Sequence, residues 1–374
     1  MGSNDISILL LVRSLEAGGA ERQLVELARG LQQRGYKVTV ATFYKRGPLL
    51  YDLEKARVPL IDLRKGGRWD LAGFLVRTAL AIRKSRPAVI YSFLGGANII
   101  ASLVRWFVPP AKLVWSIRAS NMDLRRYDWL HGLAYWVECR LSRTADLIIS
   151  NSRAGRDFAV EHGFPEDRIH VVPNGVDTDR FKPDADLRQR QRAAWGLSDE
   201  QIAVGVLARL DPMKGHGMFL EAAAHIARQR SDMRFFVVGA GSEEDRLQRL
   251  AARLDLERTM RFTGPSNTPE APLNALDICC SPSEFGEGFS NSIAEAMACG
   301  VPCAVTDVGD SALIVGGTGE VVPPSDAQAL GQAILRLAAK LGDNCRREAR
   351  DRTIDHFSVR AMVERTVATI QIGN

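Results

Sequence analysis

Short apolar runs alternate along the whole chain with segments whose apolar residues recur at helical spacing. The runs are rich in Val, Ile and Leu and lack polar alternation, which is typical of parallel strands covered on both faces. Five runs lie in each half of the chain, at residues 6–12, 37–43, 88–93, 112–117, 145–150, 202–208, 233–239, 260–264, 277–281 and 302–306. This alternation predicts an α/β protein built from doubly wound parallel sheets.

Turn-forming residues separate the two halves. The segment 171–184, VVPNGVDTDRFKPD, contains two prolines and the pair Asn174-Gly175, and a polar stretch rich in Arg and Gln follows it. We therefore expect one domain over residues 1–175 and a second over 176–374. Ligands of doubly wound sheets bind at the carboxyl ends of the strands, so two facing sheets would form an interdomain cleft lined by strand-to-helix loops.

Composition excludes several classes of protein. The chain has 374 residues, enough for two domains, with 46% hydrophobic and 25% charged residues, so neither a disordered nor a fibrous protein fits. The longest early apolar run, 6–12, is too short to span a bilayer and is wrongly flanked for a secretory signal, so we expect a cytoplasmic protein. The six cysteines contain no C-x-x-C pair, so neither a disulfide framework nor a zinc site is indicated.

Charge is unevenly distributed. Residues 1–175 contain 26 Lys and Arg against 16 Asp and Glu, whereas residues 176–374 contain 23 against 28, which gives +10 and −5. The first half therefore suits an anionic partner: a membrane surface, a phosphorylated acceptor or a nucleic acid. A solvated basic surface explains the excess equally well. No RNA- or DNA-binding module pattern appears, so we expect no nucleic-acid partner.

Three segments of the first half resemble interfacial helices. Residues 68–86, 105–112 and 125–140 each mix aromatic and long aliphatic residues with Arg or Lys, as helices lying on a bilayer do. Buried domain helices give nearly the same pattern, and we favour the core for most of these residues. The basic charge keeps peripheral attachment to an anionic membrane as an expectation.

The first strand leads into a glycine pair. Gly18 and Gly19 precede a helix that begins near Ala20 and ends before Gly35. The free amides of that helix N-terminus could receive a phosphate or an acceptor hydroxyl. A tight turn alone also explains two glycines.

Two cations follow the strand at 202–208. Arg209 and Lys214 lie at its carboxyl end, where a guanidinium fork and an ammonium can converge on one diphosphate. Most Lys and Arg are solvated, so surface charge is the alternative.

The stretch 281–307 carries two carboxylates around a helix start. A Gly/Ser loop leads into a helix expected from about Ser290 to Cys299, with Glu287 in the loop and Glu295 in the helix. The loop amides suit an anion, and the carboxylates can hold hydroxyl groups. Alternatively, Ser292 and Glu295 form a capping box, although this does not explain why Glu287 lies between two glycines.

These residues resemble the E-x7-E motif of the retaining GT-B glycosyltransferases of family 4, with Glu287 and Glu295 as the two acids. Four further features of that family occur in its order, and the resemblance covers nearly the whole chain. They are the GGAE loop at 18–21, P-N-G-V-D at 173–177, Arg209 with Lys214-Gly215, and F-x-G at 262–264.

The resemblance implies two Rossmann-like domains facing a cleft and a role for each motif. Glu295 would hold the ribose of a nucleotide sugar, and Glu287 the hydroxyls of the transferred sugar. Arg209 and Lys214 would neutralise the departing diphosphate without a metal. The loop backbone at Gly288, Phe289, Ser290 and Asn291 would assist Glu287, the base would lie near Arg261 and Thr263, and the acceptor loop would include Gly18, Gly19 and Arg118.

One position departs from the family pattern. Many relatives have a His after the strand equivalent to 112–117, whereas this chain has Arg118. Arg118 could bind an acceptor phosphate or a donor oxygen, or be a surface residue, and no general base is assigned.

Two further motifs are not expected to be functional. The acidic pair at 177–179 lies in the interdomain motif, so we do not expect a metal there. The segment GAGSEE at 239–244 lacks the third glycine of a nicotinamide-binding fingerprint.

The resemblance implies a retaining glycosyltransferase with a nucleotide-sugar co-substrate, UDP-sugar favoured over GDP-sugar, and no other cofactor. The acceptor would be a glycan or a lipid-linked sugar of surface-polysaccharide assembly, bound by the first domain at the cytoplasmic face of the inner membrane. The last helix could pack back on the first domain rather than remain with the second. A nucleotide-sugar 2-epimerase and a non-catalytic sugar-nucleotide-binding protein remain alternatives, and the oligomeric state is left open.

Overall fold

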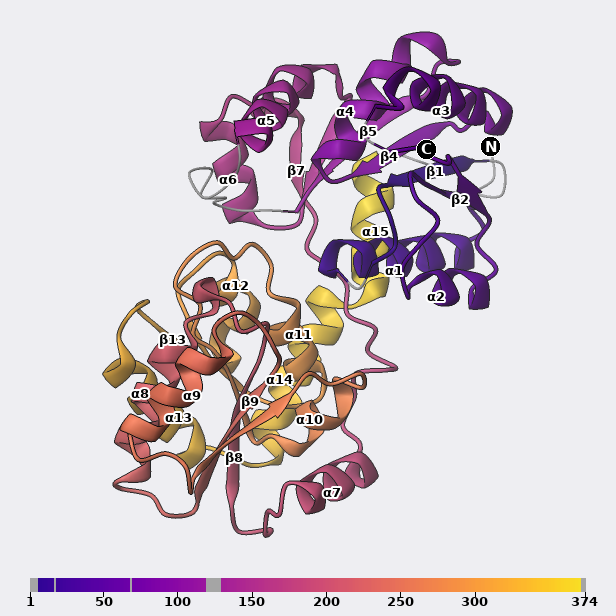
Figure 1. Cartoon of the computed structure of the whole chain (residues 1–374). Coiled ribbons are helices and arrows are strands. Elements are labelled where there is room, and N and C mark those ends of the chain that lie inside the picture. Colours follow the sequence, from indigo (N-terminus) through magenta and orange to yellow (C-terminus); the bar gives the residue numbers. More distant parts are fainter. Residues whose placement is uncertain (1–5, 17, 68, 119–128, 371–374) are drawn as a thin grey trace. The chain divides into compact units, whose positions relative to one another are not determined.

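The computed structural model describes residues 6–16, 18–67, 69–118 and 129–370, without the side chains of 129–131. It divides into two compact units (Figure 1). Unit 1 comprises Met1–Gly175 and Val359–Asn374, and unit 2 comprises Val176–Ser358.

Unit 1 is built on a seven-stranded sheet in the order β3-β2-β1-β4-β5-β6-β7, and every neighbouring pair is parallel. The strand order reverses between β1 and β4, which makes the carboxyl ends of these strands a topological switch point. The strands are β1 (Ser7–Val12), β2 (Lys37–Thr42), β3 (Leu60–Asp62), β4 (Val89–Phe93), β5 (Lys112–Ile117), β6 (Leu147–Ser150) and β7 (Ile169–Val171).

Helices cover both faces of this sheet. One apolar cluster joins the sheet to α1, α2 and α15, and the other joins it to α3, α4 and α6. The helices are α1 (Gly19–Gln33), α2 (Leu50–Lys55), α3 (Leu71–Ser85), α4 (Gly95–Val104), η2 (Arg105–Phe107), α5 (Trp129–Leu141), η4 (Ser142–Thr144), α6 (Arg153–Glu161), η5 (Glu166–Arg168) and α15 (Val359–Ile370). The last helix thus belongs to unit 1, where it lies against α1 (Figure 1).

The chain leaves unit 1 through a tightly held glycine. The Gln23 amide of α1 donates to the Gly175 carbonyl (2.9 Å) and accepts from the Gly175 N–H (2.8 Å). A Cβ at Gly175 would lie 2.7 Å from the Val359 Cα, so only glycine fits where the chain leaves unit 1 beside the segment that returns to it.

Unit 2 has a six-stranded parallel sheet in the order β10-β9-β8-β11-β12-β13. The order reverses between β8 and β11, which forms a second switch point. The strands are β8 (Ile202–Leu207), β9 (Met233–Val238), β10 (Met260–Gly264), β11 (Ile278–Ser281), β12 (Cys303–Thr306) and β13 (Glu320–Val322). The helices are α7 (Ala185–Ala194), η6 (Pro212–Lys214), α8 (His216–Ala227), α9 (Glu244–Arg253), α10 (Glu270–Ala275), α11 (Asn291–Ala298), α12 (Ser311–Val315), η7 (Gly316–Thr318), α13 (Ala327–Ala339) and α14 (Asp343–Phe357).

The structure confirms the predicted fold class of two parallel α/β sheets. All ten apolar runs are strands, and three further strands, β3, β7 and β13, have only three residues each. Within the described ranges, no helix has the length and apolar character needed to cross a bilayer.

Candidate functional site

The central feature of unit 2 is a buried ion pair at the switch point. Lys214 ends η6, which follows β8, and Glu287 lies in the loop that follows the neighbouring strand β11. The Lys214 ammonium pairs with Glu287 Oε1, and the Ser283 hydroxyl donates to the same oxygen (3.0 Å). Only 18% of the Lys214 side chain and 8% of the Glu287 side chain are exposed. The β8–β11 edge therefore holds a cation and an anion with little water between them.

Glycines bring the two loops close enough to form this pair. Gly215 has φ 61°, and a Cβ there would lie 1.9 Å from the Pro282 carbonyl oxygen. The Glu284 N–H donates to the Met213 carbonyl (2.9 Å), which joins the loops directly. Any side chain at position 215 would push the loops apart.

The loop of Glu287 is held from its other side as well. The Asp310 N–H donates to the Gly288 carbonyl (3.0 Å). Gly309 has φ 61°, and a Cβ there would lie 2.3 Å from the Glu287 carbonyl oxygen. The backbone around Glu287 is therefore fixed before any ligand arrives, as binding of a developing charge requires.

Helix α11 starts directly after this loop. Ser290 is its N-cap, and Gly300, with φ 74°, follows its C-cap, close to the predicted limits. The capping-box alternative is wrong, because with Ser290 as N-cap the N3 residue is Ile293, not Glu295. The amides of the first turn have no partner inside the helix and border the Glu287 loop.

Glu295 lies on α11, half-buried, one turn beyond the helix start. Burial, followed by the nearby Glu295 carboxylate, raises the pKa of the Cys299 thiol to about 12. The carboxylate is also close enough to Arg180 to act on it electrostatically. Glu295 thus lies among charged groups of unit 2 rather than in its apolar core.

Other candidate residues of unit 2 are spread along the same edge. Arg209 follows β8 and is exposed. The Thr263 hydroxyl donates to the Val237 carbonyl (3.4 Å) near the carboxyl end of β10. Arg261 instead directs its guanidinium to the Ala194 carbonyl of α7 (3.3 Å), so its side chain is not gathered with Lys214 and Glu287.

In unit 1, Gly18 and Gly19 begin α1 directly after the β1 loop. Gly18 is the N-cap and has no side-chain cap. A Cβ at Gly18 would lie 2.0 Å from Glu21 Oε2, so the Glu21 carboxylate reaches back to this turn. A side chain at position 18 would displace only the flexible end of Glu21, since the backbone there is extended.

Arg118, at the end of β5, is held by neutral polar groups. Its Nε donates to the Ser116 hydroxyl (2.7 Å), its Nη1 donates to the Asn174 side-chain oxygen, and its guanidinium lies 4.9 Å from the centre of the Phe93 ring. Burial lowers the pKa of Arg118. These contacts disagree with the alternative of a solvated surface residue.

The sequence analysis missed a polar cluster beside Arg118. The Ser92 hydroxyl donates to the Asn98 side chain (2.7 Å), which in turn donates to Glu138 Oε1 (2.9 Å). Burial raises the pKa of Glu138. Leu94 before α4 has φ 73°, a strained value for leucine that is found mostly at functional sites. In the sequence, the glycine pair at 95–96, directly after a predicted strand, was the feature that could have indicated this cluster.

The acidic pair at 177–179 serves the local turn. Asp177 Oδ1 accepts the N–H groups of Asp179 and Arg180, both at 3.1 Å. This is an Asx turn of the kind that Asp commonly forms.

Comparisons with solved structures identify the class of fold. Over 98% of this chain and all of the other, the structure resembles Anabaena HepE in complex with UDP, with a TM-score of 0.84 and 22% identity. The two doubly wound units thus form a GT-B fold.

Sequence comparisons identify the family. A model described as "Glycosyltransferase Family 4" matches residues 17–180, and "Glycosyl transferases group 1" matches residues 201–340. The D-inositol 3-phosphate glycosyltransferase of Corynebacterium jeikeium is 34% identical over 86% of this chain and 84% of its own length. A GDP-mannose-dependent phosphatidylinositol monomannoside mannosyltransferase of Mycolicibacterium smegmatis is 34% identical over 54% of this chain and 55% of its own length. The chain therefore belongs to the group 1, family 4 glycosyltransferases.

Proposed function

We propose that this glycosyltransferase moves a sugar from a nucleoside-diphosphate sugar, bound by unit 2, to a hydroxyl of a lipid-linked or glycan acceptor, with retention of the anomeric configuration. The buried Lys214–Glu287 ion pair at the β8–β11 switch point carries this proposal. A lysine and a carboxylate fixed at one edge match the two ends of a glycosyl diphosphate, which are anionic phosphate and neutral hydroxyls.

The diphosphate is the leaving group, and its developing charge needs fixed positive partners. Lys214 turns from Glu287 to the phosphate, Arg209 reaches the same group from the end of β8, and the first-turn amides of α11 add hydrogen bonds. These groups supply the stabilisation that a metal supplies in other transferases, so we propose a metal-independent reaction with no resident cofactor.

Release of Lys214 frees Glu287 to accept hydrogen bonds from sugar hydroxyls. The same loop continues through Gly288, Phe289, Ser290 and Asn291, whose backbone assists Glu287. The Glu295 carboxylate accepts hydrogen bonds from the ribose hydroxyls. The nucleobase lies against the backbone at 261–263. With no second carboxylate assigned as a nucleophile, the acceptor hydroxyl enters on the face from which the diphosphate departs.

The relatives differ in the donor that their names give. HepE was crystallised with UDP, and the mycobacterial relative is GDP-mannose-dependent. We propose UDP-sugar as the donor of this chain. A direct comparison of UDP- and GDP-sugars at equal concentration separates the two.

Arg118 favours an acceptor with an anionic group. Its guanidinium is held between neutral partners at the carboxyl edge of unit 1, where no described carboxylate pairs with it. A phosphate of a lipid-linked sugar, or a phosphorylated sugar such as the inositol phosphate in the name of the corynebacterial relative, would supply the missing charge.

The proposal is tested by analysing the products of the purified chain. UDP-hexoses, with GDP-mannose in parallel, are incubated with and without polyprenyl-diphosphate-linked sugar and with inositol phosphate, and product anomers are assigned by NMR. We expect a retained glycosidic bond only when donor and acceptor are both present. Donor conversion without acceptor would instead identify an epimerase, and saturable UDP binding without any product would identify a non-catalytic protein.

We further propose that unit 1 contacts an anionic membrane through an apolar outer face formed by α3 and the preceding Trp69, the end of α4, η2 and α5. Helix α4 contacts α3, η2 and α5, and so joins the parts of this face. Trp69 is 92% exposed and Trp106 77% exposed, and the other large apolar members are Leu71, Val76, Leu80, Leu103, Phe107, Leu133 and Trp136. Leu103 lies outside the three segments singled out in the sequence. For the other exposed side chains the core interpretation is wrong, whereas Phe74 and Ile82 of 68–86 are buried as that interpretation predicts. Residue 68, residues 125–128 and the side chains of 129–131 lie outside the described residues.

Charge on the apolar outer face complements an anionic bilayer. Arg83, Lys84 and Arg86 are exposed at the end of α3, and Arg140 is exposed on α5, where its guanidinium lies 5.2 Å from the Trp136 ring centre. Aromatic rings beside Lys and Arg are the composition that settles at lipid headgroups.

Membrane binding is measured by cosedimentation with phosphatidylglycerol or phosphatidylcholine vesicles. We expect binding to phosphatidylglycerol that weakens as salt rises, and about tenfold weaker binding for Trp106→Ala/Phe107→Ala. Ile354→Ala, which shortens an exposed apolar residue of unit 2, is the matched control. Absence of wild-type binding at low salt would remove this part of the proposal.

A further inference from the structure

Helices α10 and α11 of unit 2 both begin at the edge of the sheet that holds the ion pair of Lys214 and Glu287. Each helix follows a strand of the parallel sheet, β10 or β11, so each runs from the carboxyl edge toward the opposite edge. The two helices contact each other and pack on the same apolar cluster. The first residues of both helices therefore lie near the edge that carries the proposed donor site.

One polar contact shows which residues of these helices face each other. The Asn274 side-chain amide of α10 donates to the Cys299 sulfur at the end of α11 (3.7 Å). Glu270 lies four residues before Asn274, and Glu295 lies four residues before Cys299, so both acids are one turn nearer the carboxyl edge. Burial, then the Glu295 carboxylate and more weakly that of Glu270, raise the pKa of the Cys299 thiol to about 12. Glu270 and Glu295 thus lie at one level on neighbouring helices.

The beginning of unit 2 is anchored on both helices. The Arg350 guanidinium, from α14, donates to the Phe181 carbonyl (3.1 Å) and to the Ala298 carbonyl at the end of α11. The Asn274 amide of α10 donates to the Lys182 carbonyl (3.1 Å). These contacts fix the backbone at 181–182 without help from the side chain that precedes it.

That preceding side chain is Arg180, which brings a positive charge to the two acids. Its Nη2 donates to Glu270 Oε2 (3.0 Å), and 38% of the Arg180 side chain is exposed, so a ligand can approach it. Burial acts to lower the pKa of Arg180, but nearby carboxylates, with Glu270 and Glu295 foremost, outweigh this effect and raise it. One guanidinium is therefore bonded to Glu270 and attracted to Glu295.

We infer that Arg180 is a positioning residue of the donor site, which holds the Glu295 carboxylate where it accepts the ribose hydroxyls. This inference rests on the proposed function, in which Glu295 has that role. Glu270 and Glu295 carry like charges, and the guanidinium offsets their repulsion. Because its bond to Glu270 fixes Arg180, its charge restricts the Glu295 side chain before the donor arrives, which lowers the entropy lost on binding.

The test compares the binding of UDP and of 2′-deoxy-UDP to the full chain by isothermal titration. The deoxy compound lacks one hydroxyl that Glu295 would accept, so we expect the wild type to bind UDP about tenfold more tightly. This preference should fall to about threefold or less in Arg180→Ala, as in Glu295→Ala, whereas Arg180→Lys keeps the charge and should retain more of it. The double variant Arg180→Ala/Glu295→Ala should show no further loss, because both residues act through one contact.

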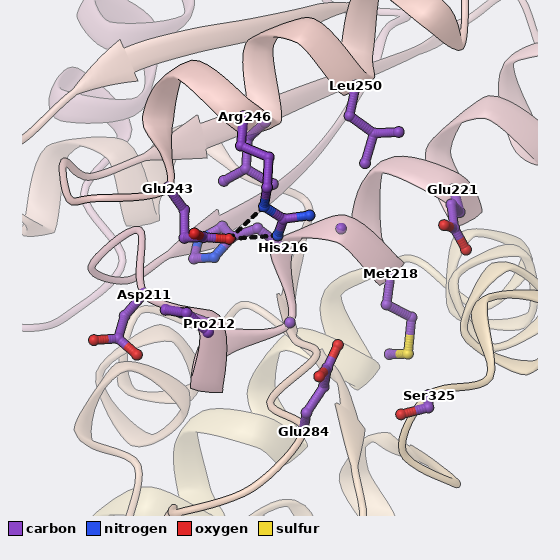
Figure 2. Close-up of a pocket in the computed structure, with 13 residues that line it drawn as sticks. Asp211, Pro212, His216, Met218, Glu221, Glu243, Arg246, Leu250, Glu284 and Ser325 are labelled. Atoms are coloured by element: carbon purple, nitrogen blue, oxygen red, sulfur yellow. Dashed lines mark hydrogen bonds and ion pairs between the residues drawn. The ribbon is translucent and has the colours of Figure 1, made fainter. Parts of the chain in front are cut away.

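The matched control is Arg246→Ala. Figure 2 shows Arg246 paired with Glu243 (2.5 Å) at the wall of a cavity lined by α8 and α9. The Glu243 side chain is 19% exposed, as is that of Glu270, and α9 packs on a different apolar cluster of the sheet. We expect Arg246→Ala to leave the preference for UDP unchanged. Equal thermal melting of the ligand-free variants checks that each is folded.

The outcomes separate this inference from the proposed function. An unchanged preference in Arg180→Ala, a further loss in the double variant, or an equal loss in Arg246→Ala would each overturn the inference while the donor site itself stands. Failure of the wild type to bind UDP, or equal affinity for UDP and 2′-deoxy-UDP, would instead remove the ribose contact and overturn both.

Discussion

The two units share a doubly wound parallel sheet but differ in how charge is held at the switch point. In unit 2 a cation and an anion are paired, Lys214 with Glu287, in loops tied together by backbone contacts. In unit 1 the described partners of a cation, Arg118, are neutral groups. Under the proposed function, a ligand of unit 2 exchanges one ionic partner of Lys214 for another, whereas a ligand of unit 1 brings an anionic group to Arg118.

The outer surfaces differ as well. Among the described residues, twelve large apolar side chains are exposed; ten belong to unit 1, and two, Val321 and Ile354, belong to unit 2. Unit 1 also holds the excess of Lys and Arg. The same architecture is thus combined with a charged binding edge in unit 2 and with an apolar, basic exterior in unit 1.

The largest expected effect is loss of stability confined to unit 2. Asp277 is buried and accepts from Arg188 (2.7 Å), Arg192 (3.0 Å), Arg346 (2.6 Å) and the Ala203 N–H (2.8 Å). Asp277→Ala leaves three guanidinium groups without this carboxylate, at a cost of about 3–5 kcal/mol in the free energy of unfolding. Denaturant unfolding followed by hydrogen exchange should show unit 2 opening first.

The control for this change is Asp232→Ala, which breaks the exposed pair between Asp232 and Arg230 in the same unit. We expect it to cost less than about 1 kcal/mol. Equal destabilisation of both variants, or parallel loss in unit 1, would contradict independent stabilisation of the two units.

The next effect concerns turnover. Lys214→Ala removes the proposed partner of the departing diphosphate, and Glu287→Ala removes the proposed sugar contact, so we expect kcat to fall by about 10²–10³-fold in each. Glu295→Ala, by contrast, should mainly weaken donor binding. Glu257→Ala, which removes an exposed carboxylate of unit 2, is the control in steady-state assays. Near wild-type kcat in both Lys214→Ala and Glu287→Ala would show that the ion pair is structural.

A smaller effect is expected in unit 1. Arg118→Ala should raise the KM for an anionic acceptor by about 10–100-fold and leave donor affinity unchanged. Arg118→Lys keeps the positive charge but loses the guanidinium fork that contacts Ser116 and Asn174. Its KM for the anionic acceptor should therefore lie between those of the wild type and Arg118→Ala. An equal rise in KM for an uncharged acceptor analogue would mean that Arg118 only supports the fold.

The smallest effect is a difference in pH dependence. Burial raises the pKa of Glu138 above its unfolded value of 4.5, although Asn98 opposes the shift, so unit 1 loses stability as pH rises through the interval above 4.5. Burial also acts to raise the pKa of Asp277, but the Ala203 N–H and the arginines outweigh it, so unit 2 loses stability as pH falls below 3.8. Thermal melts of Glu138→Gln should lack the dependence above pH 4.5, and an unchanged profile would contradict this assignment.

Local patterns predicted the elements that local residues determine. The apolar runs gave every strand longer than three residues, and Gly300 marked the end of α11. Strands β3, β7 and β13 escaped notice because three residues form no recognisable run. The capping-box interpretation failed because the helix begins at Asn291, directly after Ser290, rather than after Ser292.

Contacts between distant positions could not be predicted. Gln23 holds Gly175 across 152 positions, and Asn98 holds Glu138 across 40, and neither spacing leaves a periodic signal. Helical periodicity also cannot show which apolar face remains uncovered by protein. A helix that lies on a membrane and one that packs on a core have the same pattern of apolar residues. The exposed rings of Trp69 and Trp106 therefore required the structure.

The central claim is that unit 2 exchanges the Glu287 carboxylate for a diphosphate as the partner of Lys214. A crystal structure of the chain with bound UDP tests it most directly. We expect Lys214 Nζ within hydrogen-bonding distance of a phosphate oxygen, Glu287 released from it, and the ribose hydroxyls on Glu295. UDP bound away from the β8–β11 edge, with the Lys214–Glu287 pair intact, would contradict the account.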